Sequence, residues 1–254
     1  MVVKVMSFNI RMDAYDDVDE RDWSYRKVLV AKTIEKETPD VIGFQEVMPG
    51  PYEYLCQSLK GYGSIITYRD DSENPEGCPV FYREERYEVK DKGSFWLSET
   101  PEKMSRDWDS GCYRICSYVL LADKDSGKEF LVFNTHLDNA SEEARIKGIR
   151  VVLDKIAEMG NVPAVLMGDF NAIEDSETYR SAMESFLDVK YQTERSMTGC
   201  TYQNWGQELE NECIDYIMIS KEGFCVNSYK IVTDTYDGVY PSDHFPIVTE
   251  LDLE

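Results

Sequence analysis

The chain has 254 residues, with 27 lysines and arginines against 49 aspartates and glutamates, and so carries a formal net charge of −22. A hydrophobic content of 42% with 12% aromatic residues excludes intrinsic disorder, because this composition can bury enough apolar surface to fold. The acidity argues against a broad DNA-binding or membrane-binding surface, since a duplex-binding protein neutralises about 6 to 10 phosphates with clustered basic residues and the sequence has no such cluster.

Short apolar runs alternate with helical patterns and no linker interrupts them, which predicts a single domain over residues 1–254. Strands are predicted at residues 2–9, 40–47, 63–67, 78–82, 87–96, 115–122, 129–136, 163–169, 213–220, 225–232 and 245–251. Helices are predicted at residues 24–37, 51–59, 141–159 and 176–186, with Ser141 and Ser176 as N-caps. The pattern is typical of a mixed α/β (α+β) domain.

The chain enters its first strand pattern directly, without signal-peptide features, and no apolar run approaches the roughly 18 residues of a membrane-spanning helix. Its seven cysteines are scattered and form no C-x-x-C pair, so we predict reduced thiols rather than a disulfide framework or a zinc ribbon. We expect a monomer without membrane association. The expected location is the cytoplasm, or outside it if a signal peptide has been removed.

Polar side chains stand at the ends of six predicted strands. Four strands run into Asn9, into Gln45 and Glu46, into His136, and into Asp169 and Asn171, whereas two strands begin with Asp215 and with Asp243 and His244. If the first four run toward one edge and the last two run away from it, all these residues meet at one rim. The chain has only two histidines, and both belong to this set.

Six segments carry a family resemblance: SFNIR (7–11), DVIGFQEV (40–47), NTHLD (134–138), GDFN (168–171), IDYI (214–217) and SDHFP (242–246). In order and spacing they resemble the motifs of the endonuclease/exonuclease/phosphatase superfamily, the DNase I-like fold. The resemblance implies a four-layer sandwich of two packed mixed β-sheets with helices outside, and metal-dependent hydrolysis of phosphate esters.

The predicted metal site is built on Glu46, which matches the metal carboxylate of the family, while Asp243 resembles a position that contributes to the metal or its water shell. The candidate ligands are hard oxygen atoms, which favours Mg²⁺ or Mn²⁺ over Zn²⁺. The alternative for Glu46 is a solvated acid at a strand end. Whether one metal or two acts is left open.

The predicted catalytic residues are Asp169, Asn171, Asp215, His244 and His136. By resemblance, Asp169 deprotonates the attacking water and Asn171 donates to a phosphate oxygen, although an Asx-turn would also place Asp169 and Asn171 together. Asp215 is expected to orient His244 and to favour its protonated form, which stabilises charge on the phosphoryl group. His136 is expected to contact the phosphate from the other side.

Three further residues are predicted to bind substrate. Asn9 is expected to help orient the ligands around the metal. Arg114 lies where related proteins also carry arginine, and Arg145 begins the helix after His136; a guanidinium suits phosphate. The alternative is that both arginines form ion pairs at the surface, and it has the same weight as substrate binding.

The substrate is less constrained than the reaction. The segment after Asp215 lacks the PAW-x-DR type of sequence of inositol polyphosphate 5-phosphatases, and NTHLD with FWLSETP (95–101) looks most like bacterial relatives of deadenylases and nucleotide phosphatases. We therefore predict a hydrolase of mono- or diesters that acts on a small phosphorylated metabolite, nucleotide or short single strand, with no duplex nucleic acid as partner. The alternatives are a DNA or RNA nuclease and a non-catalytic binding module on the same fold.

Overall fold

The computed structural model describes residues 1–194, 199–210 and 213–254. Its strands are β1 (Val2–Asn9), β2 (Val41–Gln45), β3 (Tyr62–Ile65), β4 (Val80–Arg83), β5 (Tyr87–Trp96), β6 (Ile115–Asp123), β7 (Glu129–His136), β8 (Ala164–Asp169), β9 (Phe186–Asp188), β10 (Asp215–Ser220), β11 (Phe224–Ile231) and β12 (Ile247–Leu253). Its α-helices are α1 (Trp23–Glu37), α2 (Pro49–Ser58), α3 (Glu142–Glu158) and α4 (Glu177–Met183). Three short 3-10 helices cover Asp19–Arg21, Val189–Tyr191 and Asn204–Gly206.

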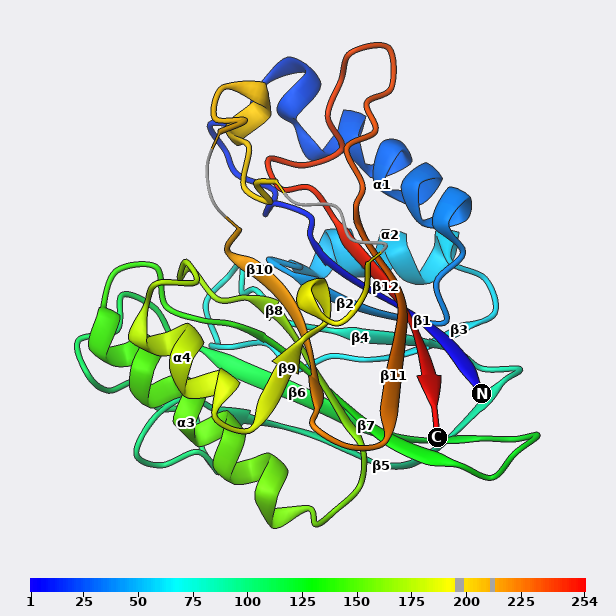
Figure 1. Ribbon diagram of the computed structural model, residues 1–254. Helices are drawn as coiled ribbons and strands as arrows, with labels where there is room; N and C mark the ends of the chain where they lie inside the picture. Colours follow the sequence, from blue (N-terminus) through cyan, green and yellow to red (C-terminus); the bar gives the residue numbers. More distant parts are fainter. Residues whose placement is uncertain (195–198, 211–212) are drawn as a thin grey trace.

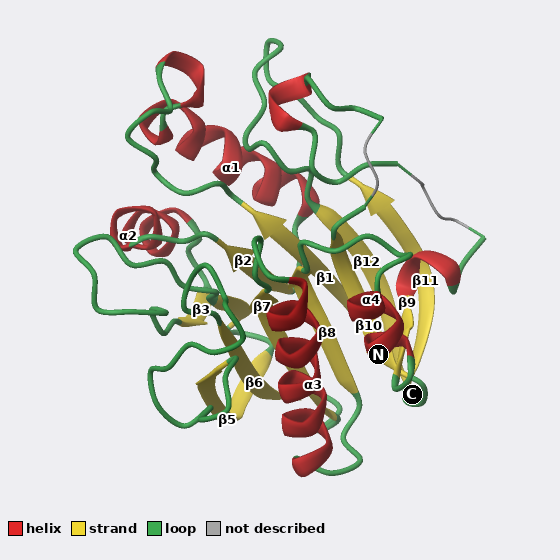
Figure 2. Ribbon diagram, turned by 90° about the vertical axis from the view of Figure 1, so that its left-hand side faces the viewer, coloured by secondary structure: helices red, strands yellow, loops and turns green. Residues whose placement is uncertain are grey.

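The strands form two mixed six-stranded sheets, in the orders β11-β12-β1-β2-β4-β3 and β5-β6-β7-β8-β10-β9. Figure 1 shows α1 and α2 on the outer side of the first sheet and α3 and α4 on the outer side of the second; Figure 2 shows the same layers turned by 90°. This arrangement confirms the predicted four-layer sandwich.

Strand β1 shows how the sequence builds the layers, because successive side chains of a strand point to opposite faces. Val3 and Val5 belong to the same core cluster as Val132 of β7, between the sheets. Phe8 belongs instead to the cluster that contains Ile34 of α1. Burial on both faces explains the nearly continuous apolar sequence of this central strand.

A buried polar contact joins the two sheets directly behind the strand ends. Gln45 donates from Nε2 to Asn134 Oδ1 at 2.7 Å, and Asn134 donates in turn to the carbonyl of Phe44 at 2.8 Å. Gly43 permits this approach, since a Cβ at that position would lie 2.8 Å from the Asn134 side chain. Buried amide hydrogen bonds of this kind fix the relative position of two layers.

The predicted helix starts at Ser141 and Ser176 are confirmed, because their hydroxyls accept from the backbone N–H groups of Ala144 and Tyr179. The prediction of a helix over 176–186 was wrong at its end: α4 ends at Met183, and β9 follows as a short edge strand on β10. Strand β9 has only three residues, which are too few for an alternation of apolar and polar residues to be recognised in the sequence. Within the described ranges, no helix combines the length and apolarity needed to cross a membrane.

Candidate active site

The strand ends with polar residues meet at one edge of the sandwich. Strands β1 and β2 are parallel, as are β7 and β8, and His136 lies directly opposite Asp169 in the register. Strand β10 runs antiparallel to β8 and places Asp215 opposite Asp169 on its other side. The carboxyl ends of four strands and the beginning of β10 thus supply the site from rigid elements.

The backbone carries strain at three positions of this edge. Glu46 and Asn171 have φ values of 61° and 47°, a left-handed conformation that side chains other than glycine rarely adopt and that gathers at functional sites. Gly168 has a φ of 147°, and a Cβ there would lie 1.9 Å from the carbonyl oxygen of Thr135. Glycine is therefore required immediately before Asp169.

Glu46 is held by two hydrogen bonds. Its Oε1 accepts from Asn9 Nδ2 at 3.0 Å, and its Oε2 accepts from the backbone N–H of Met12 at 2.9 Å. Burial opposes ionisation, but these hydrogen bonds outweigh it and keep the pKa of Glu46 below its ordinary value. The side chain is therefore an oriented, ionised carboxylate.

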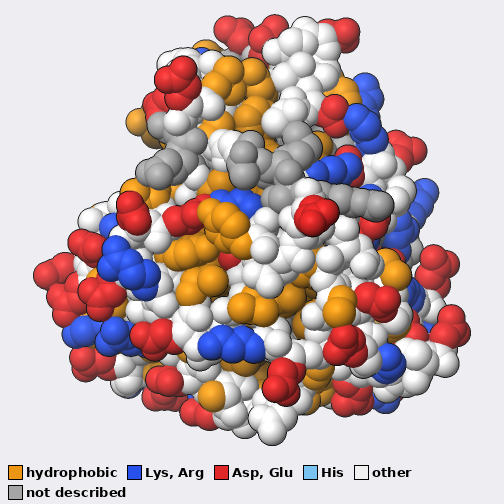
Figure 3. Space-filling view, viewed as in Figure 1, with side chains coloured by type: hydrophobic (Ala, Val, Ile, Leu, Met, Phe, Trp, Pro, Cys, Tyr) orange, Lys and Arg blue, Asp and Glu red, His pale blue; other side chains and the backbone are white. Residues whose placement is uncertain are grey.

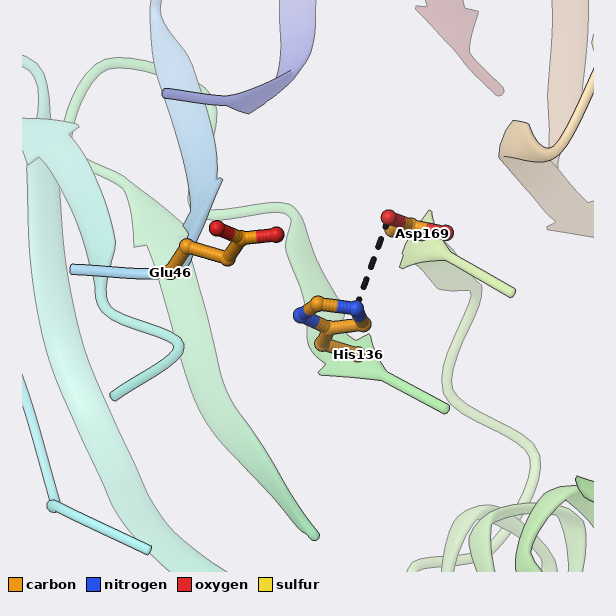
Figure 4. Close-up of side chains that lie close together, drawn as sticks. All are labelled: Glu46, His136 and Asp169. Carbon is orange, nitrogen blue, oxygen red and sulfur yellow. Dashed lines mark ion pairs between the residues drawn. The ribbon is translucent and has the colours of Figure 1, made fainter. Parts of the chain in front are cut away.

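Asp169 lies at the centre of the site. Its Oδ2 accepts from Asn9 Nδ2 at 3.0 Å and lies 3.4 Å from His136 Nε2 and 3.8 Å from His244 Nε2. Figure 4 shows His136 between Glu46 and Asp169, with the His136–Asp169 contact dashed. Burial and the charge of Asp215 raise the pKa of Asp169 to about 7. Such a carboxylate exchanges protons near neutral pH.

The two histidines have opposite electrostatic environments. Burial and the nearby Arg114 hold the pKa of His136 well below its ordinary value. Burial acts in the same direction on His244, but the charge of Asp215 and its hydrogen bond outweigh it and raise the pKa of His244 well above the ordinary value. His244 Nδ1 donates to Asp215 Oδ2 at 2.9 Å. One ring is thus neutral and the other cationic near pH 7.

Asn171 already uses both donors of its amide. Its Nδ2 lies 2.9 Å from His136 Nε2 and donates to the carbonyl of Leu137 at 3.0 Å. Its backbone N–H donates to Asp169 Oδ1 at 2.9 Å, which is the turn contact expected of an Asx-turn. A donation to phosphate would therefore replace the contact with His136.

These residues surround an open cavity of about 480 Å³. Seven of its lining residues were predicted from the sequence: Glu46, Arg114, His136, Asp169, Asn171, Asp243 and His244. Asn9 and Asp215 are buried behind the lining, in contact with Glu46, Asp169 and His244.

The two predicted arginines occupy different places. Arg114 lines the cavity and is also paired with Asp138, its Nε 3.4 Å from Asp138 Oδ2. This ion pair is buried rather than at the surface, and the contact of Arg114 with substrate stays a prediction. Arg145 does not line the cavity; it donates to the backbone carbonyl of Asp138 at 2.9 Å. The predicted contact of Arg145 with substrate therefore has no support from this geometry, because its guanidinium is used to hold the loop after β7.

The lining also contains residues that were not predicted, among them Arg11, Arg69, Glu76 and Tyr202. Arg11 lies inside the SFNIR segment, so the motif contained a signal for it. Arg69 and Glu76 come from the loop between β3 and β4, where neither periodicity nor a motif marks them. Tyr202 packs on His244 with ring centroids 5.0 Å apart, a contact that only the fold creates.

Two groups of described residues offer ligand atoms within 4.8 Å of one another: Glu46 with His136 and Asp169, and Asp169 with Asp215 and His244. Among the described residues, Asp243 belongs to neither group, although it lines the same cavity. A divalent cation fits the first group, because a positive charge there would relieve the crowding of buried carboxylates around Asp169. Carboxylate oxygen also suits Mg²⁺ and Mn²⁺.

Known proteins share this architecture. A crystal structure from Bacteroides vulgatus, described as an endonuclease/exonuclease/phosphatase, matches with a TM-score of 0.95 and 33% identity over 100% of both chains. A Bacteroides thetaiotaomicron protein described as a mannosyl-6-phosphatase matches with a TM-score of 0.92 and 32% identity, over 99% of this chain and 100% of that chain.

More distant relatives are longer. Human nocturnin is 23% identical over 286 residues, which cover 98% of this chain but only 64% of nocturnin. Residues 6–244 match the sequence model of the Endonuclease/Exonuclease/phosphatase family. That match includes every predicted site residue, from Asn9 to His244. The chain therefore belongs to the endonuclease/exonuclease/phosphatase family, whose members are phosphoric ester hydrolases.

Proposed function

We propose that the chain is a divalent-metal-dependent phosphomonoesterase that acts on a small phosphorylated metabolite such as a sugar phosphate. The observation that carries this proposal is the meeting of Glu46, His136, Asp169 and His244 around one cavity of about 480 Å³. This volume is within the range of about 300 to 1,000 Å³ for small-ligand sites. The match to a protein described as a mannosyl-6-phosphatase supports a phosphorylated sugar.

The charge distribution favours a small substrate over a nucleic acid. The chain has a net charge of −22, and on the face in Figure 3 basic side chains stand singly or in small groups among acidic ones. A long polyanion is repelled by such a surface, whereas one phosphate in a cavity is bound by local groups. The nuclease alternative, suggested by relatives such as a Candida albicans exoribonuclease subunit, therefore has less support.

The proposed roles follow from the environment of each side chain. Glu46 would hold Mg²⁺ or Mn²⁺, and Asp243 would bind the same ion or its water shell. When bound, such an ion polarises a phosphoryl oxygen. Asp169 is proposed to accept a proton from the attacking water, because its buried carboxylate lies at the centre of the site, with Oδ2 3.4 Å from His136 Nε2 and 3.8 Å from His244 Nε2.

The remaining side chains act on the phosphoryl group. His244, kept cationic by Asp215, is proposed to stabilise the negative charge that develops on its oxygens. Asn171 and His136 are proposed to contact the phosphate from the β7 and β8 side. Arg114 is proposed to bind substrate from the wall of the cavity.

A panel of esters tests the proposal. The purified chain is assayed with Mg²⁺ or Mn²⁺ on hexose 6-phosphates, nucleoside monophosphates, p-nitrophenyl phosphate, bis(p-nitrophenyl) phosphate and single-stranded RNA, with and without EDTA. We expect release of inorganic phosphate from monoesters, with EDTA abolishing it. Cleavage of diesters or RNA alone would favour the nuclease alternative, and no turnover of any ester would favour a binding module.

A further inference from the structure

An ion pair lies beside the proposed metal position and has no role in the chemistry described above. Arg69 and Glu76 form a bidentate pair, with Nη2 2.5 Å from Oε1 and Nη1 3.1 Å from Oε2. The Glu76 side chain is 9% exposed and that of Arg69 is 18% exposed, and both line the cavity. The pair is therefore preformed, and a ligand in the cavity can reach it.

The backbone fixes this pair next to Glu46. The N–H of Arg69 donates to the carbonyl of Glu76 at 2.8 Å, so the same two residues are joined by main chain and side chain. Gly77 exchanges two backbone hydrogen bonds with Val47, at 2.8 and 3.2 Å. Trp96 donates from its indole to the carbonyl of Arg69 at 2.7 Å. Since Val47 follows Glu46 and Gly77 follows Glu76, the ion pair is held beside Glu46.

Ion pairing neutralises the arginines of the cavity wall. Each of the three arginines that line the cavity has a carboxylate partner: Arg11 with Asp17 at 3.1 Å, Arg69 with Glu76, and Arg114 with Asp138 at 3.4 Å. The wall therefore offers no unpaired guanidinium in the described residues. A substrate that carried a second phosphate would place it beside carboxylates without a free cation to compensate it.

The Arg69–Glu76 pair suits hydroxyl groups instead. A guanidinium has five N–H donors, and a carboxylate has about four acceptor positions, so a bidentate contact leaves donors and acceptors unused side by side. A sugar hydroxyl both donates and accepts, and can therefore bind to both members without separating them. A buried polar wall of this kind discriminates strongly against a ligand that leaves its groups unpaired.

We propose that the Arg69–Glu76 pair is the specificity determinant for the part of the substrate beyond its phosphate, and that it selects a neutral, hydroxyl-bearing body over a body with a second phosphate. This inference rests on the proposed phosphomonoesterase function. It narrows the substrate class to monophosphates of sugars or similar polyols.

Steady-state kinetics with Mg²⁺ on three monoesters tests the inference. The probes are hexose 6-phosphates, hexose 1,6-bisphosphate, and p-nitrophenyl phosphate, which has no hydroxyl group. For the unchanged chain, we expect kcat/KM to be at least about tenfold higher for a hexose 6-phosphate than for either other probe, the difference that about 1.4 kcal/mol of binding gives.

The decisive variant is Glu76→Gln, which keeps the shape of the side chain and removes the bidentate carboxylate partner of Arg69. Among the described residues, the guanidinium then keeps only the ion pair of its Nε with Asp70, at 3.6 Å. We expect the ratio of kcat/KM for hexose 6-phosphate to that for p-nitrophenyl phosphate to fall about tenfold, through a change in KM. The corresponding ratio for hexose 6-phosphate to the bisphosphate should fall by a similar factor. The control is Glu73→Gln, the same charge change at an exposed position of the same loop, for which no change in either ratio is expected.

Two further outcomes keep the inference separate from the proposed function. If Glu76→Gln does not fold, the double variant Arg69→Gln with Glu76→Gln removes both charges of the pair and is expected to lose the preference for hexose 6-phosphate. Equal effects of Glu76→Gln on all three esters would overturn the inference while the phosphomonoesterase function stands. Absence of metal-dependent turnover of all three esters would overturn both.

Discussion

His244 donates from Nδ1 to Asp215 Oδ2 at 2.9 Å, and both side chains are buried. This contact fixes the ring and keeps it protonated. The substitution Asp215→Asn removes the negative charge but retains a polar group, so His244 is expected to lose its cationic form. We expect kcat to fall about 100-fold or more, with a smaller change in KM, measured on the best ester of the panel. Asp154→Asn, an exposed acid on α3, is the control and should retain full activity.

A buried guanidinium joins the loops that carry the site. Arg26 is 0% exposed, and it donates to the carbonyls of Ile10 at 2.6 Å, Met12 at 3.2 Å and Pro241 at 3.3 Å. Arg26→Met leaves these buried carbonyls without a donor, so the free energy of unfolding should fall by about 3 kcal/mol or more. Urea denaturation measures it. Arg150→Met, which removes one exposed ion pair between α3 and α4, should cost less than about 1 kcal/mol.

Gly168→Ala tests the close approach before Asp169. The new Cβ would meet the carbonyl oxygen of Thr135 at 1.9 Å, so either strand β7 or strand β8 must shift. We expect a loss of stability well above the cost of about 1 to 2 kcal/mol for a left-handed alanine alone, together with loss of activity. Gly127→Ala is the matched control, because Gly127 has a φ of 70° and open space around its Cβ position. Similar losses in the two variants would contradict the steric account.

Asp138 is expected to make the free energy of unfolding sensitive to acid. Burial opposes its ionisation, but hydrogen bonds from the backbone N–H groups of Ser141 and Gly111 outweigh it and hold the pKa of Asp138 well below its ordinary value. A carboxylate whose folded pKa is depressed stabilises the fold above its unfolded pKa of about 3.9 and loses that contribution as the pH falls toward the folded pKa.

The difference in unfolding free energy between the unchanged chain and Asp138→Asn should therefore be constant near pH 7 and shrink below about pH 4. Urea denaturation across this pH range measures the difference. A difference that grows on acidification would show that the sign of the effect is wrong.

The sequence was most informative where polar residues interrupt apolar strands. Asn9, His136 and Asp169 end buried strands, and the parallel register of each strand pair carries them to the same edge. The order of the motifs therefore predicted the fold and the residues that meet. Asp243 and His244 were placed correctly at this edge, although β12 begins only at Ile247.

Contacts between loops could not be predicted in the same way. Arg69 and Glu76 are brought beside Glu46 by the pairing of Gly77 with Val47, and no local pattern encodes that pairing. Arg145 shows the opposite case, because its place after His136 suggested the cavity while its guanidinium holds a backbone carbonyl. Local sequence specifies elements and their ends, whereas the direction of a long side chain depends on neighbours distant in the chain.

The most direct test of the central claim is the turnover of p-nitrophenyl phosphate by the unchanged chain and by Glu46→Gln, titrated with Mg²⁺ and with EDTA. Glu46→Gln keeps the size of the side chain but removes the charge proposed to hold the metal. We predict Mg²⁺-dependent turnover that EDTA abolishes, and a loss of about 100-fold in the variant with weaker Mg²⁺ activation. Turnover that is indifferent to EDTA, or equal in the two proteins at all Mg²⁺ concentrations, would contradict a metal-dependent site at Glu46.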